Sequence, residues 1–239
     1  KYGFFQTEKS SFLDVASELG MKKLNDQNIQ FSRHPLAFLV EAADDICYTI
    51  IDFEDGINLG LIEEDYALEY LINLVRHTIN TEKYNSLSST KERVSYLRAL
   101  AISTLIEDAV SLFMANEKQI LDGDFHVSIL DKSKYQAQIN DIIRLSIEKI
   151  YNADEVIDKE ISGFEILNEL LSRFISSVNN NYNNIPSSYD KLLLKLLPKE
   201  LDILNDSIYT RVMNVCYFIS LFSDKKAVLT YKKIKGLAF

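Results

Sequence analysis

The segment from His34 to Gly56 reads HPLAFLVEAADDICYTIIDFEDG, and its pattern is the strongest evidence for the fold. Its apolar residues recur at helical spacing. Pro35 suits the first turn of a helix, because the N–H that proline lacks would have no partner there. We therefore predict a helix over residues 35–54. Two carboxylates, Asp44 and Asp45, stand inside this otherwise apolar run, where an unpaired buried charge is costly.

Asp44, Tyr48 and Asp52 are spaced four residues apart in this helix. At about 100° per residue they spread over about 80° of one face and about 12 Å along the axis. Such a row suits a metal-bound phosphate at one end and a sugar hydroxyl further along. The alternative is a solvent-exposed acidic stripe. The apolar residues around the rest of the helix favour burial of this acidic face in a pocket.

The composition outside this segment also favours helices. The 239 residues include only 7 Gly and 3 Pro, too few for the many tight turns of a β-sandwich or barrel. We predict an all-α fold with two regions, residues 1–119 and 120–239, or a single domain. Besides the helix over 35–54 and a long helix opening at the capping box of Ser89 and Glu92, helices are expected over residues 10–20, 63–79, 134–151, 154–178, 198–222 and 224–235.

Charge and cysteine content limit the functional classes. The net charge of −9 argues against a surface built mainly for nucleic-acid backbone. No uncharged run approaches the ~18 residues that cross a bilayer, so no membrane association is expected. Cys47 and Cys216 both lie in apolar surroundings, which argues against a disulfide framework and favours a reducing, cytoplasmic location. Cys47, on an apolar face, is expected to be a buried thiol.

Several segments together resemble one enzyme family. RHPLAFLVEAADDICYTIIDFEDG resembles the segment of bacterial deoxyguanosine triphosphate triphosphohydrolases that supplies the last metal ligand of their HD domain. The resemblance continues in chain order, so it covers the whole sequence. It implies an all-α, HD-domain-like helical bundle of which this chain is the C-terminal portion. The further segments are GFFQTE, SYLRALAISTLIEDAVSLFM, YNADEVIDKEISGFEIL and FSDKKAVLTYKKIKG.

The resemblance implies metal-dependent hydrolysis of dGTP, or of other dNTPs, to the deoxynucleoside and inorganic triphosphate. Asp44 matches the metal-ligand aspartate for Mg²⁺ or Mn²⁺. Tyr48 matches a tyrosine that packs on the deoxyribose and crowds the place of a ribose 2′-hydroxyl. Asp52 matches the acceptor of the 3′-hydroxyl, and Glu160 matches a glutamate of guanine recognition. The resemblance also implies a homo-oligomer.

The sequence departs from the family pattern at one essential place. HD-domain enzymes need a His and then a His-Asp pair before the final aspartate, and this chain contains no His-Asp dipeptide. Three metal ligands and the catalytic histidine are therefore expected upstream, and no catalytic residue is expected within this chain. We predict that these 239 residues alone are inactive.

Other interpretations remain open. A nucleotide-sensing HD-like protein would bind dNTPs without cleaving them, and another HD phosphohydrolase would cleave a different nucleotide. The three histidines, far apart in sequence, are expected at the surface or in caps. Arg98 and Arg211 are expected in structural pairs rather than on phosphate. Five lysines in KKAVLTYKKIKG predict a solvated helix face, with single-stranded DNA or a neighbouring subunit as the alternative partner.

Overall fold

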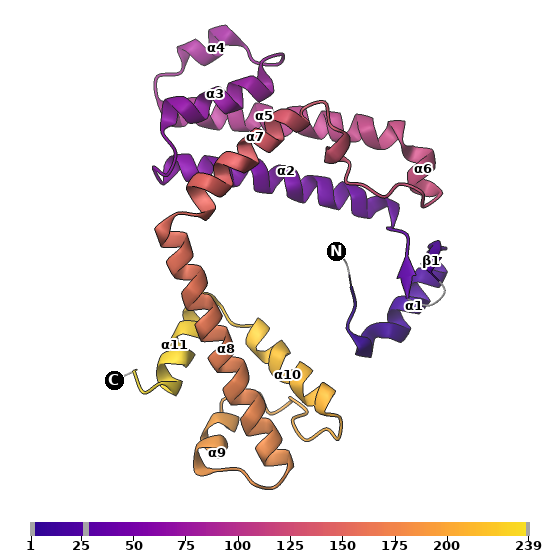
Figure 1. The fold of residues 1–239 in the computed structure, drawn as a ribbon, viewed down its shortest axis with the longest axis vertical. Coiled ribbons are helices and arrows are strands. Elements are labelled where there is room, and N and C mark those ends of the chain that lie inside the picture. The colour runs from indigo at the N-terminus through magenta and orange to yellow at the C-terminus, as the bar shows by residue number, and fades with distance from the viewer. Residues whose placement is uncertain (1–2, 26–28, 238–239) are drawn as a thin grey trace. The chain divides into compact units, whose positions relative to one another are not determined.

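The structure is a computed structural model that describes residues 3–25 and 29–237. Within these ranges the chain is almost entirely helical, which confirms the predicted all-α class (Figure 1). The exception is a short antiparallel ladder that pairs β1 with β2. The elements in chain order are η1 (Gln6–Glu8), α1 (Lys9–Glu18), β1 (Lys23–Asn25), β2 (Gln30–Phe31), α2 (Pro35–Asn58), α3 (Glu64–Val75), α4 (Thr81–Ser86), α5 (Thr90–Ala115), α6 (Glu117–Leu121), η2 (Leu130–Lys132), α7 (Gln136–Ser146), η3 (Ile147–Tyr151), α8 (Asp154–Tyr182), α9 (Ser188–Leu194), α10 (Ile208–Ser220) and α11 (Asp224–Ile234).

Two compact units divide the chain after Ala153. Each unit has its own cluster of buried apolar side chains. The sequence suggested a boundary between residues 119 and 120. The helices of residues 120–153 belong with α2, α3 and α5, because α7 packs against both α2 and α3.

The first unit is built around α2 and α5, which lie side by side, with α3 and α7 packed on them (Figure 1). The core of this unit is aliphatic and aromatic, as expected for helices that each bury one apolar stripe. Its most deeply buried large side chains include Phe38, Phe53, Ile46, Leu71, Leu97, Leu105 and Ile142.

Helix α2 begins where the sequence predicts. The Nδ1 atom of His34 accepts a hydrogen bond from the backbone N–H of Leu36, and Pro35 occupies the first turn. His34 is therefore a capping residue. The buried side chains of α2 recur every three or four residues and form one stripe, so the opposite side of the helix is exposed. The buried side chains are Phe38, Ala42, Ile46, Ile50, Phe53 and Ile57, with Gly56 among them.

The second unit consists of α8 with α9, α10 and α11 packed against it. Its core is formed mainly by the C-terminal half of α8 and by α10. Buried residues of this core are Leu170, Phe174, Val178, Leu193, Val215 and Phe218.

The helix expected over residues 198–222 is shorter than predicted. Only α10, Ile208–Ser220, and the turn after it are observed, and residues 198–207 form turns. The side chains of Asp202 and Asn205 hydrogen-bond to each other, and Ser207 caps α10 by accepting from the N–H of Thr210. Short polar side chains compete in this way for local hydrogen bonds and delay the start of a helix.

No helix within residues 3–25 and 29–237 combines the length and the apolar content that crossing a membrane requires.

Candidate functional site

The candidate site lies on α2, where the helix brings Asp44, Tyr48 and Asp52 onto one face. Asp44 is exposed, Asp52 is half-buried, and the Tyr48 side chain has an exposed fraction of 63%. The structure thus reproduces the row that the spacing predicts. Asp44 and Tyr48 of this row are open to solvent.

The acidic face of α2 is not buried in the way that the sequence predicts. The helix buries a single stripe, and the apolar residues on its other side, such as Val40, remain exposed. Cys47, expected to be a buried thiol, is exposed for the same reason. Apolar residues around the whole helix do not by themselves show which of them a neighbouring helix covers.

Asp52, the last residue of the row, makes a contact that the sequence does not reveal. The hydroxyl of Tyr151 donates a hydrogen bond to Oδ2 of Asp52 over 2.6 Å. Burial and this hydrogen bond raise the pKa of Tyr151 well above its ordinary value, so its phenol stays protonated and remains a donor. The two residues are 99 positions apart in the chain. Only the packing of η3 against α2 brings them together.

Tyr151 is the last residue of η3, which is a turn of π-helix that continues α7. Such turns are rare and often occur at functional sites. This turn approaches α2 closely at Gly56, where an added Cβ would lie 2.7 Å from Cγ1 of Ile150. A side chain larger than hydrogen at position 56 would therefore displace the side chain of Ile150, the neighbour of Tyr151.

A cavity of about 460 Å³ adjoins the row and is lined by residues of α2, η2 and α7 together with Tyr151. This volume is in the range of small-molecule sites. Asp45 and Tyr48 form part of its wall, whereas Asp44 does not. The hydroxyl oxygens of Ser128 and Ser146, also in the wall, are buried and have no hydrogen-bond partner among the described residues. Buried polar groups of this kind usually bind water or a ligand, because leaving them unpaired is costly.

Glu160, the residue expected to recognise guanine, is exposed on α8 in the second unit. It makes no hydrogen bond or ion pair within the described parts of the chain. Its role stays a prediction.

The part of the chain that the structure describes offers no group of three His, Cys, Asp or Glu side chains arranged to hold a metal ion. Asp44 by itself provides one exposed carboxylate. The residues present therefore do not fit a complete metal site.

The two arginines singled out in the sequence have structural partners. Arg98 pairs with Glu54 over 2.8 Å, and Arg211 donates to the side chain of Asn179 and to the backbone carbonyls of Asn205 and Asp206. These contacts confirm the structural interpretation of both.

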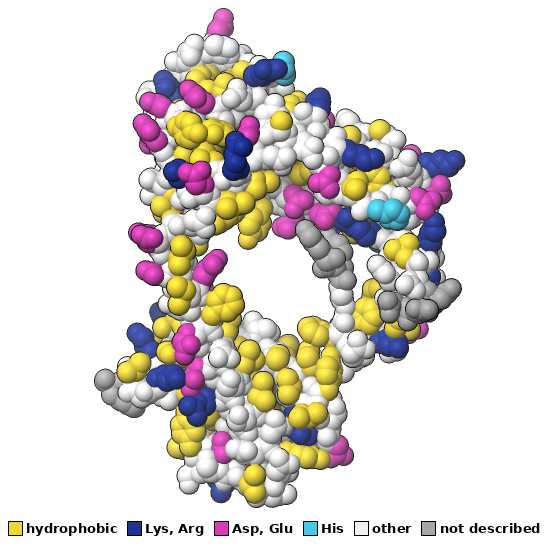
Figure 2. All heavy atoms as spheres, viewed as in Figure 1, with side chains coloured by type: hydrophobic (Ala, Val, Ile, Leu, Met, Phe, Trp, Pro, Cys, Tyr) yellow, Lys and Arg dark blue, Asp and Glu magenta, His cyan; other side chains and the backbone are white. Residues whose placement is uncertain are grey.

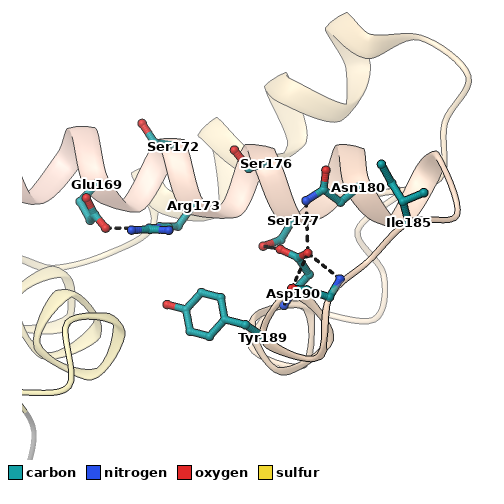
Figure 3. Close-up of a pocket in the computed structure, with 10 residues that line it drawn as sticks. Glu169, Ser172, Arg173, Ser176, Ser177, Asn180, Ile185, Tyr189 and Asp190 are labelled. Carbon is teal, nitrogen blue, oxygen red and sulfur yellow. Dashed lines mark hydrogen bonds and ion pairs between the residues drawn. The ribbon is translucent and has the colours of Figure 1, made fainter.

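A second cavity, of about 480 Å³, lies between α8 and α9 in the second unit (Figure 3). The buried carboxylate of Asp190 accepts hydrogen bonds from the side chains of Ser177 and Asn180 and from both the N–H and the hydroxyl of Ser187. These donors, Ser177 first, hold the pKa of Asp190 far below its ordinary value. The carboxylate is fully engaged in joining two helices, so we interpret it as structural.

Comparison with known proteins adds a family relationship. No protein-family model matches the chain. The chain is 34% identical over all its 239 residues to a deoxyguanosinetriphosphate triphosphohydrolase-like protein of Synechocystis, of which it covers 53%. It is 28% identical to a protein of the same name from Pseudomonas aeruginosa and 27% identical to one from Listeria monocytogenes, covering 54% and 55% of them. The chain thus spans about half the length of these curated relatives.

Proposed function

We propose, from the homology of this chain to proteins named deoxyguanosinetriphosphate triphosphohydrolase or triphosphohydrolase-like, that the protein containing it hydrolyses dGTP to deoxyguanosine and inorganic triphosphate. The chain is the C-terminal part of that enzyme in this proposal. The observation that carries it is the row of Asp44, Tyr48 and Asp52 on one face of α2, beside a cavity of small-molecule size.

Two residues of the row select the sugar in this proposal. The Tyr48 ring packs on the deoxyribose and occupies the space that a ribose 2′-hydroxyl would need. Asp52 accepts a hydrogen bond from the 3′-hydroxyl, and a substrate without that hydroxyl would leave the carboxylate unpaired. The half-burial of Asp52 supports this assignment, because a partly shielded acceptor gains more from the hydrogen bond.

We assign Asp44 as one ligand of a divalent cation, Mg²⁺ or Mn²⁺. Its exposed carboxylate is an oxygen donor of the type that such hard cations prefer. The remaining ligands and the catalytic histidine belong to the part of the enzyme outside this chain. Glu160 is the proposed recognition residue for guanine.

We also propose that the enzyme is a cytoplasmic homo-oligomer. Hydrophobic side chains lie at the surface of both units between charged ones (Figure 2). Exposed apolar patches of this kind are typical of protein interfaces. The lysines of α11, including Lys225 and Lys233, offer a secondary partner surface for single-stranded DNA.

The test is product analysis with the purified full-length protein, dGTP and Mg²⁺ or Mn²⁺. We expect deoxyguanosine and triphosphate in equal amounts, and none with an Asp44→Ala variant. Release of pyrophosphate and dGMP, or no reaction with any dNTP, would show that the proposal is wrong. Light scattering on the same samples tests the oligomer, which an active monomer would exclude.

A nucleotide sensor is the second candidate. The sequence of the full-length protein separates the two candidates: a His and a His-Asp pair outside this chain support the enzyme, and their absence there supports the sensor. A full-length protein that binds dGTP in calorimetry but never cleaves it would support this alternative.

A further inference from the structure

We infer that Tyr151 is a positioning residue for Asp52, and that it sets the selectivity of the enzyme for a sugar with a free 3′-hydroxyl. This inference rests on the proposed function, in which Asp52 accepts that hydroxyl. It adds a residue from η3 to a site that the sequence placed on α2 alone.

The geometry of the carboxylate is the first argument. Tyr151 donates to Oδ2 of Asp52 over 2.6 Å, the short distance typical of a hydroxyl donating to a charged oxygen. Among the described residues Oδ1 of Asp52 accepts no hydrogen bond. One oxygen is thus held by the protein, and the other is left to accept a hydrogen bond from a ligand.

The placement of Tyr151 is the second argument. Its neighbour Ile150 is 7% exposed and packs into the core against α2 at Gly56, which fixes the backbone of the π-turn. Tyr151 itself is 37% exposed, and it lines the same cavity as Tyr48. A side chain that served only to fasten η3 to α2 would not need to face this cavity.

The consequence for selectivity follows from the way a carboxylate rotates. Without the Tyr151 hydroxyl, the Asp52 side chain can turn about its terminal bond and loses the orientation in which Oδ1 is presented. Fixing the Asp52 side chain in this orientation when the substrate binds then costs free energy, whereas in the native enzyme the side chain is already fixed. Only substrates that use Oδ1 are affected, which means substrates with a 3′-hydroxyl.

The experiment compares two substrates with the full-length protein and a Tyr151→Phe variant. We expect kcat/KM for dGTP to fall about 10-fold, the loss typical of a hydrogen bond to a charged group. For 2′,3′-dideoxy-GTP the change should stay within about twofold, because that substrate does not use the Asp52 acceptor. In an Asp52→Ala background the Tyr151→Phe change should have no further effect on dGTP.

The matched control is Tyr66→Phe, which removes a hydroxyl bonded to that of Tyr70 in the same unit. It should leave both substrates unaffected. Equal losses of Tyr151→Phe on both substrates, accompanied by a lower Tm, would show a structural contact only and overturn the inference. If the wild-type protein cleaves neither substrate, the proposed function is wrong and the inference falls with it.

Discussion

Of the two carboxylate oxygens of Asp52, Oδ2 accepts a hydrogen bond from Tyr151, and we assign Oδ1 to the substrate. Substitution of Asp52 tests this assignment. Asp52→Ala should lower kcat/KM for dGTP by about 10–100-fold, because it removes a charged acceptor for the sugar hydroxyl. The affinity for Mn²⁺ should not change, since Asp44 is unaltered. Steady-state kinetics and calorimetry with the full-length protein measure the two quantities. Loss of metal binding in this variant would contradict the division of roles along α2.

Tyr48 is a second residue whose substitution has a distinct result. Tyr48→Ala should raise the activity on GTP relative to dGTP, because the ring that excludes a 2′-hydroxyl is gone. The fold should be little affected, since the side chain is 63% exposed. The measurement is the ratio of kcat/KM for the two substrates. An unchanged ratio would mean that Tyr48 belongs to a solvated helix face.

At the scale of single residues, the sequence predicted the row on α2 but not its partner. A spacing of four residues fixes which side chains share a helix face, whatever the rest of the fold. The contact of Tyr151 with Asp52 depends on tertiary packing across 99 positions. Tyr151 opens the segment YNADEVIDKEISGFEIL, which resembles the enzyme family, but nothing in that segment indicates a contact with Asp52.

Among the elements, most helix starts were predicted more accurately than burial. Ser89 caps α5 as predicted, and α11 begins at residue 224 as predicted, where the side chain of Ser223 accepts from the N–H of Lys226; helix starts of this kind are set by local chemistry. The covered side of α2 depends on α5 and α7, and an all-round apolar helix carries no signal for it. Helices α4 and α9 are short, which makes their periodicity too weak to recognise.

The contact between α2 and η3 predicts the effect of Gly56→Ala. The new Cβ would lie 2.7 Å from Cγ1 of Ile150, so the Ile150 side chain must shift within the core. We expect the free energy of unfolding to fall by about 1–3 kcal/mol, as overpacking usually costs. Urea unfolding measures this, and dGTP activity should fall in parallel because Ile150 adjoins Tyr151 in η3.

The control for that substitution is Gly163→Ala in α8, where nothing lies within 4 Å of the added Cβ. It should raise stability by about 0.5–1 kcal/mol, since alanine favours a helix interior over glycine. A Gly56→Ala protein as stable as the wild type would show that the Ile150 side chain accommodates the added Cβ without cost.

The hydrogen bonds that the Asp190 carboxylate accepts between α8 and α9 predict that the stability of the second unit depends on pH. The pKa of Asp190 is lowered in the folded state, so its ionised form stabilises the second unit. This contribution is complete above the ordinary aspartate pKa of about 3.9, and it is lost as the pH falls further through the folded pKa. Asp190→Asn should therefore lower the Tm at pH 7 by about 5 °C, and the difference from wild type should shrink below about pH 4.

Circular dichroism melts from pH 7 to pH 3 measure this difference, and hydrogen exchange locates it in the amides of α8 and α9. The matched control is Asp158→Asn, a carboxylate of α8 that is exposed and makes no hydrogen bond within the described residues. It should not alter the Tm. A constant Tm difference at every pH would contradict the role assigned to the charge of Asp190.

For the whole molecule, the sequence predicted the class of fold and left the division into units open. The break after Ala153 carries no run of Gly, Pro or Ser, and helical segments flank it on both sides. The polar stretch of residues 179–188 forms the end of α8 and the turn into α9, and it lies inside one unit. Which helices share a core is decided by contacts that local composition does not record.

Cys47 is exposed beside the row of Asp44, Tyr48 and Asp52, so a thiol reagent can reach it. Its free thiol should react with a small alkylating reagent faster than the half-buried thiol of Cys216, because reagents reach it directly. In the full-length protein, dGTP should slow alkylation of Cys47 and leave Cys216 unchanged, which mass spectrometry of timed samples measures. Equal rates at the two cysteines would contradict the greater exposure of Cys47. The cysteine next to Tyr48 thus serves as a built-in reporter of whatever binds over the row.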